Sequence, residues 1–99
     1  MVTSDSQITK LSRTLSLFQD PMRLRLFLLL VKLGSARKEL CVSELAEELG
    51  SSVSNTSHQL RKLELAGIVD RLRRGRMICY QFRKNQFNMR LYNFLRSSL

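Results

Sequence analysis

The stretch SSVSNTSHQLRKLELAGIVDRLRRGRMICYQF, residues 51–82, decides the fold. Its first half has the pattern of a helix. Ser51 or Ser52 offers an N-cap, because serine accepts a hydrogen bond from the free backbone amides of a first turn. Gly67 stops the helix after Ala66. The pattern therefore predicts one helix of about four turns.

The second half of the stretch has the pattern of a β-hairpin. Residues 68–72 predict a strand, residues 73–76 a tight turn, and residues 77–82 a return strand with alternating side chains. A basic hairpin that directly follows a helix is typical of a wing, which we assign to residues 68–83.

A second, shorter helix precedes the first one. Ser43 is a good N-cap for a helix over residues 44–49, and Gly50 ends it. Two helices joined by such a short turn predict a helix-turn-helix over residues 43–66. The apolar residues 40–42 before it predict one small strand.

Three more helices are expected outside this unit, at residues 6–18, 22–33 and 85–97. Pro21 favours the start of the second and Gly34 its end, and this helix is apolar enough to be central. The predicted fold is mainly α with a small β wing, about five helices in one domain, residues 1–99. The first helix carries a helically spaced apolar stripe, Ile8, Leu11, Leu15 and Phe18.

The composition points to a polyanionic partner. Seventeen Lys and Arg face eight acids, which gives a net charge of +9 and a pI near 10.6. A domain this basic usually meets nucleic acid, although a generically basic surface is the alternative. No apolar run is long enough to span a bilayer, and residues 1–10 are polar, so we expect a cytoplasmic protein without a membrane partner.

The longer helix has two distinct faces. Val53, Thr56, Leu60 and Leu63 recur at helical spacing and are predicted to face the core. Short and amide side chains on the other side suit close entry into a major groove, whereas an ordinary solvated face would carry more Glu and Lys. Val53, at the helix start, is also expected near DNA. The expected contacts on this helix are Val53, Ser54, Asn55, Ser57, His58, Gln59 and Arg61.

Arginines surround Gly75 in the predicted hairpin. Arg73, Arg74 and Arg76 suit contacts with phosphates or with a narrow minor groove. A charge run that only solvates an edge strand is the alternative. Its position after the longer helix favours the wing.

Residues 15–83 resemble the ArsR/SmtB winged-helix repressors. The resemblance rests on DPMRLRLFLLL and on ELCVSELAEELGSSVSNTSHQLRKLELAGIVDRLRRGRMICYQF. It implies a homodimer, packed through residues 6–18 and 85–97, that binds an inverted repeat in double-stranded DNA. Half-sites would then lie about 34–36 Å apart.

The family's metal sites do not carry over to this chain. One site needs a second cysteine where this chain has Ser43, and serine is a poor ligand for soft metals. The other needs His and carboxylates on the last helix, where QFNMRLYNFLRSSL has none. We therefore expect no metal and no cofactor.

Cys41 and Cys79 are the two cysteines of the chain. In a winged helix the strand before the helix-turn-helix can pair with the return strand of the wing, which would bring them together as a redox pair. Two buried, unbridged thiols are the alternative that the composition favours.

The most direct interpretation is a dimeric, sequence-specific DNA-binding repressor. The residues expected to read bases are Ser54, Asn55, Ser57, His58 and Gln59. Those expected to hold phosphates or the minor groove are Arg61, Arg73, Arg74 and Arg76. A basic architectural or RNA-binding module without sequence preference is the alternative, and a protein-interaction subunit a third. An enzyme is not expected, because no set of catalytic groups converges. The sequence names no inducer.

Overall fold

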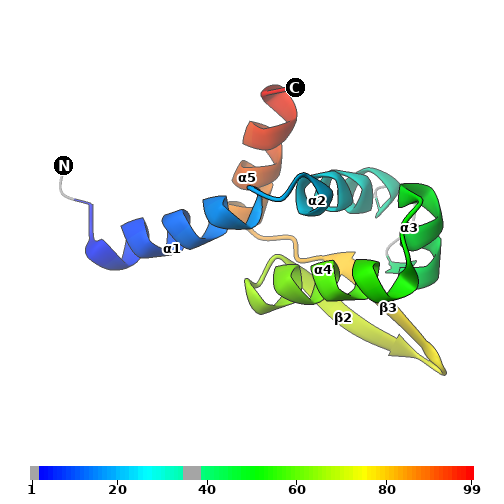
Figure 1. Ribbon diagram of the computed structural model, residues 1–99. Coiled ribbons are helices and arrows are strands. Elements are labelled where there is room, and N and C mark those ends of the chain that lie inside the picture. The colour runs from blue at the N-terminus through cyan, green and yellow to red at the C-terminus, as the bar shows by residue number, and fades with distance from the viewer. Residues whose placement is uncertain (1–2, 35–38) are drawn as a thin grey trace.

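The computed structural model describes residues 3–34 and 39–99 (Figure 1). These ranges hold five helices and three strands, in the order α1, α2, β1, α3, α4, β2, β3, α5. The bounds are α1 Asp5–Leu17, α2 Pro21–Gly34, β1 Leu40–Cys41, α3 Val42–Leu49, α4 Val53–Leu65, β2 Val69–Arg74, β3 Met77–Phe82 and α5 Gln86–Ser97. The predicted class, mainly α with a β-hairpin wing, is confirmed.

The three strands form one antiparallel sheet in the order β1-β3-β2. Strands β2 and β3 make the wing, with Val69 opposite Phe82 and Arg74 opposite Met77. Strand β1 pairs with the other side of β3. The central strand β3 therefore joins the wing to the chain that leads into α3.

The core lies between α2, α3, α4 and the base of the sheet. Burial of its side chains from water supplies the main driving force for this packing. Phe27 of α2 stands at its centre, within ring-centroid distances of 5.3 Å from Phe18, 5.9 Å from Phe82 and 6.1 Å from Tyr92. The fully buried members include Leu26, Phe27, Leu30, Leu45, Leu60, Leu63, Ile68 and Val69.

Helix α1 extends away from this body, and α5 rises beside its end (Figure 1). Thr14 is the sole buried residue of α1. Most of the predicted stripe is exposed in the single chain, at 54% for Ile8, 48% for Leu11 and 46% for Leu15. Phe94 of α5 is 61% exposed.

Two predicted element boundaries are wrong. Helix α3 begins at Val42, two residues before the predicted start at residue 44. Cys41 is the N-cap, because the Glu44 carboxylate accepts a hydrogen bond from the amide of Cys41 (3.0 Å) and so closes the first turn. Strand β2 runs to Arg74, so the turn is shorter than the predicted 73–76. Gly75, with φ +62°, takes the left-handed conformation that so tight a turn requires.

Among the described residues, no helix has the length and apolar character needed to cross a bilayer.

Candidate nucleic-acid interface

Helix α4 follows α3 through a turn of three residues, 50–52. Gly50 ends α3 in the left-handed conformation (φ +63°), which glycine adopts without steric cost. Ser52 then caps α4, since its hydroxyl accepts a hydrogen bond from the amide of Asn55 (3.0 Å). Between the two predicted caps, Ser51 and Ser52, the structure selects the second.

The outward face of α4 carries small, polar and basic side chains. Ser54, Asn55, His58 and Arg61 are exposed, and Ser57 is half-buried. The opposite side enters the core through Thr56, Leu60 and Leu63, as the spacing predicted. The face is thus free to approach a ligand.

The helical spacing predicted that Val53 faces the core, but its side chain lies outside the core. Its side chain is 54% exposed, because the first turn of α4 projects beyond the packed part of the helix. It stands at the same end of α4 as Ser54 and Asn55. Only its other predicted location, beside the polar face, agrees with the structure.

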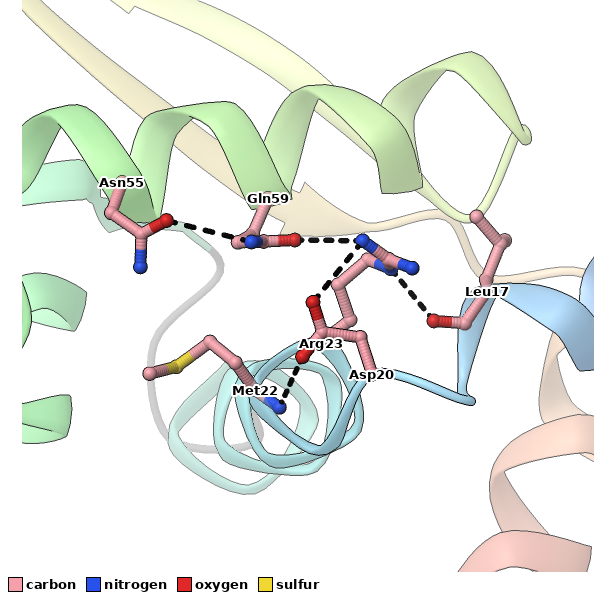
Figure 2. Close-up of polar contacts among 6 residues, drawn as sticks. All are labelled: Leu17, Asp20, Met22, Arg23, Asn55 and Gln59. Carbon is pink, nitrogen blue, oxygen red and sulfur yellow. Dashed lines mark hydrogen bonds and ion pairs between the residues drawn. The ribbon is translucent and has the colours of Figure 1, made fainter.

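Gln59 does not lie on the open face. It is 8% exposed, and its Oε1 accepts a hydrogen bond from Nη1 of Arg23 over 2.9 Å. Its Nε2 faces Oδ1 of Asn55 at 3.5 Å (Figure 2). The expectation that Gln59 is free to read a base is therefore wrong for this conformation, because a cation 36 residues earlier holds it inside.

The arginines of the wing are exposed. Nε of Arg74 is 3.0 Å from a carboxylate oxygen of Glu39, and Nε of Arg73 donates to the carbonyl of Gly75 (3.2 Å). The Arg74 side chain is 57% exposed, so this ion pair is worth little and exchanges readily with another anion. Arg76 is exposed beside them.

An ion pair holds the base of the wing. Nη2 of Arg83 lies 2.6 Å from Oδ1 of Asp70, and the hydrogen bond to this carboxylate raises the pKa of the already basic guanidinium. The carbonyl of Ile68 accepts from the amide of Arg83 (2.9 Å). These contacts fix where the hairpin leaves the end of α4.

Cys41 and Cys79 lie opposite each other in β1 and β3, with Cα atoms 3.7 Å apart, and their sulfurs form a disulfide. The strand pairing agrees with the expected juxtaposition. The favoured expectation of two unbridged thiols is wrong. Cys79 is fully buried and Cys41 is partly exposed.

The described residues hold no group of three or more His, Cys, Asp or Glu side chains that could bind a metal ion.

The comparison with protein families decides the identity of the chain. The model of the family described as "Bacterial regulatory protein, arsR family" matches residues 20–71, more than half of the chain. The chain belongs to the arsR family. The match runs from the start of α2 into β2, and so includes all of α3 and α4.

Several arsR-type proteins are similar to the chain. The transcriptional repressor SmtB homologue of Synechocystis is 40% identical over 92% of this chain and 64% of its own length. The chain thus spans just under two thirds of that relative. The antimony-specific repressor AntR has the same fold, with a TM-score of 0.79 at 23% identity over 95% of this chain and 80% of its own. A homodimeric winged helix-turn-helix DNA-binding domain from Mycobacterium bovis gives 0.76 at 22% identity over 99% and 88%.

Sequence reasoning missed Arg23, which organises one side of α4. Its position in the first turn of α2 looks like an ordinary solvated charge. The pairing with Gln59 depends on how α2 crosses α4, and no local pattern encodes that crossing. The available sign was an arginine on a largely apolar helix, three residues after Asp20.

Proposed function

We propose that this protein is a dimeric, sequence-specific DNA-binding repressor that recognises an inverted repeat. One observation carries the proposal. Helix α4, which exposes Ser54, Asn55, His58 and Arg61, packs against strand β2 of a wing whose turn is flanked by exposed arginines. A helix with small polar side chains can enter the major groove, while arginines on a hairpin hold the adjacent backbone.

The α4 face supplies the base contacts. Asn55 has the amide that pairs bidentately with adenine, and the hydroxyl of Ser54 can contact a base or a phosphate. His58 and Ser57 lie further along the helix. Val53, exposed at the helix start, provides an apolar surface for a thymine methyl group. Gln59 is left out of this set because its side-chain oxygen already accepts a hydrogen bond from Arg23.

The wing and Arg61 supply contacts to the phosphate backbone. Arg74 leaves Glu39 for a phosphate, and Arg73 and Arg76 extend the same basic surface. Each neutralised phosphate releases condensed counterions, so affinity should fall steeply as salt rises. The net charge of +9 adds long-range attraction.

The second copy packs against α1 and α5. In the single chain α1 leaves Ile8, Leu11 and Leu15 exposed, and Phe94 of α5 is exposed as well. Apolar area of this kind is stabilised by burial in an interface. The homodimeric M. bovis domain has the same fold, which supports this choice of partner.

Repression is supported by the SmtB homologue and by AntR, both of which are named as repressors. A protein that represses transcription by covering a promoter needs only to bind DNA. We therefore propose no catalytic step, metal or other cofactor. Because bacterial DNA lies in the cytoplasm, we place the protein there. Its inducer is not assigned.

Selection of bound duplexes from a random pool tests the proposal. We expect a palindromic consensus with half-sites about one helical turn apart. His58→Ala should relax preference at one base pair of each half-site. A bound pool without any consensus would instead support a non-specific architectural protein, and preferred binding of RNA would support an RNA-binding module.

The wing has its own test. Arg76→Ala should weaken binding to selected and random DNA alike and reduce the slope of log affinity against log salt by roughly one. Arg25→Ala on α2 is the matched control, since this exposed arginine lies outside α4, the wing and the two helices assigned to the dimer. Equal losses for both variants would contradict the wing's role.

We also propose that DNA binding responds to thiol oxidation, because a disulfide joins β1 to β3. Hydrogen peroxide would take two electrons from the two thiols, which form one S–S bond and yield two molecules of water. In a reducing cytoplasm such a bond is transient, as expected for a sensor. Oxidation fastens the wing to the chain before α3, and reduction releases it.

Operator affinity of the oxidised and the dithiothreitol-reduced protein tests this response. We expect the oxidised protein, with its wing fastened, to bind the operator more tightly than the reduced protein. Neither hydrogen peroxide nor dithiothreitol should change the affinity of a Cys41→Ala, Cys79→Ala double variant. Equal affinities before and after reduction, with thiol titration confirming the change of state, would refute it.

A further inference from the structure

Arg23 has a fixed position at the junction of α1 and α2. Its Nε donates to the carbonyl oxygen of Leu17 (2.7 Å), and its Nη1 lies 3.4 Å from Oδ2 of Asp20. The other oxygen of Asp20 accepts from the amide of Met22 (2.9 Å), so this carboxylate is held too (Figure 2). The arginine side chain is only 13% exposed. It therefore reaches α4 from a rigid base.

The contact with Arg23 fixes the polarity of the Gln59 amide, that is, which of its two ends faces Arg23. A guanidinium has donors and no acceptor, so only the oxygen of the Gln59 amide can face it, at 2.9 Å from Nη1. The NH₂ group of Gln59 is thereby turned toward Asn55. With a neighbour that both donates and accepts, such as a hydroxyl, the two ends of this amide could exchange.

The same polarity passes on to Asn55. Its Oδ1 receives Nε2 of Gln59 at 3.5 Å, and its Nδ2 donates to the hydroxyl of Ser51 at 3.0 Å. Asn55 itself is exposed at the start of α4. One largely buried cation on α2, acting through Gln59, thus orients the two ends of an exposed amide on α4.

We propose that Arg23 and Gln59 are positioning residues that set the base preference of Asn55. Recognition of adenine by an asparagine requires its oxygen toward N6 and its nitrogen toward N7, so a reversed amide presents the wrong pattern. A pre-set amide also avoids the ordering cost on binding. This inference rests on the proposed function, because it needs α4 to read DNA.

Gln59→Glu tests the polarity directly. Glutamate keeps the contact with Arg23, but it has only acceptors, so Asn55 must turn its NH₂ group toward residue 59. We expect duplex selection to give a changed preference, by roughly tenfold, at the base pair that Asn55→Ala identifies. Preferences set by His58 should be unaffected.

Arg23→Met removes the source of the polarity. We expect the preference at the same base pair to weaken, while the rest of the consensus is retained. Arg25→Met is the matched control, since Arg25 is exposed on the same helix. Thermal melts of all variants separate a loss of folded protein from a loss of preference.

The side-chain amide resonances of Asn55 supply a readout without DNA. In NMR spectra of the free protein they should shift in Gln59→Glu and stay in place in Arg25→Met. A wild-type consensus that Gln59→Glu leaves unaltered, or unmoved Asn55 resonances, would overturn this inference alone. A wild-type protein that selects no consensus would overturn the proposed function, and the specificity role with it.

Discussion

The side-chain amide of Asn88 donates a hydrogen bond to the carbonyl oxygen of Gly67 over 3.1 Å. The same nitrogen donates to the carbonyl of Arg83 over 2.8 Å, and Asn88 is 2% exposed. One buried amide thus joins α5 to both ends of the wing. The wing and α5 are held in one arrangement by this contact.

Asn88→Ala should lower the free energy of unfolding by about 1–3 kcal/mol, because it removes both hydrogen bonds of a buried side-chain amide. Urea unfolding measures the change. Asn93→Ala, at an exposed position of the same helix, is the control and should cost less than about 0.5 kcal/mol. Similar losses at both positions would contradict the bridging role.

Thr56→Val should stabilise the protein by about 1 kcal/mol. The hydroxyl of Thr56 is buried and has no hydrogen-bond partner among the described residues, so its removal relieves a desolvation cost. Thr14→Val makes the same change where the hydroxyl donates to the carbonyl of Lys10 (2.9 Å). Thermal unfolding should therefore show no gain for Thr14→Val.

Gly50→Ala should destabilise the protein by about 1–2 kcal/mol, because its φ of +63° strains any residue with a Cβ. Open space around that Cβ rules out a clash as the cause. Gly34→Ala, at the end of α2 without a positive φ, should leave stability unchanged or raise it. Chemical denaturation of both variants checks the difference in sign.

Reduction of the disulfide should lower stability by about 4 kcal/mol, the chain-entropy estimate for a loop of this length. Cys41 and Cys79 are 38 positions apart, so the closed loop includes α3, α4 and most of the wing. Guanidinium unfolding with and without dithiothreitol measures the change. The double alanine variant should give one midpoint under both conditions.

Stability should fall at alkaline pH because of Tyr80. Its burial, reinforced by the nearby Glu64 carboxylate, raises the pKa of the phenol above 10.0 in the folded protein. The unfolded chain then releases this proton first as the pH rises. The contribution of the Tyr80 phenol to the free energy of unfolding is complete below pH 10. It is lost as the pH rises through the pKa of the phenol in the folded protein. Unfolding at pH 8 to 11 should show a shallower decline for Tyr80→Phe.

Local patterns predicted most of the fold. The bounds of β3 and most of the exposed face of α4 follow from side-chain periodicity and from glycine and serine at the ends of elements. The start of α3 was misplaced because Ser43 is a better cap by type than Cys41. The Glu44 carboxylate satisfies the amide of Cys41 and shifts the boundary.

The candidate site was predicted in outline, and its errors come from tertiary contacts. Gln59 was expected outside because it neighbours His58 along the helix, yet Arg23 draws it inward. Val53 fits the apolar spacing, but the core does not extend to the first turn of α4. The disulfide depends on strand register, which composition alone does not specify.

Among the described residues, the sheet order β1-β3-β2 leaves one edge of β2 unpaired. An open edge can recruit a strand from another molecule, and positive side chains repel such a neighbour. Arg71, Arg73 and Arg74 lie along this edge and are exposed. Arg73 and Arg74, which we assign to the DNA backbone, therefore also protect the protein from edge-to-edge aggregation, and a wing stripped of several arginines would lose solubility together with affinity.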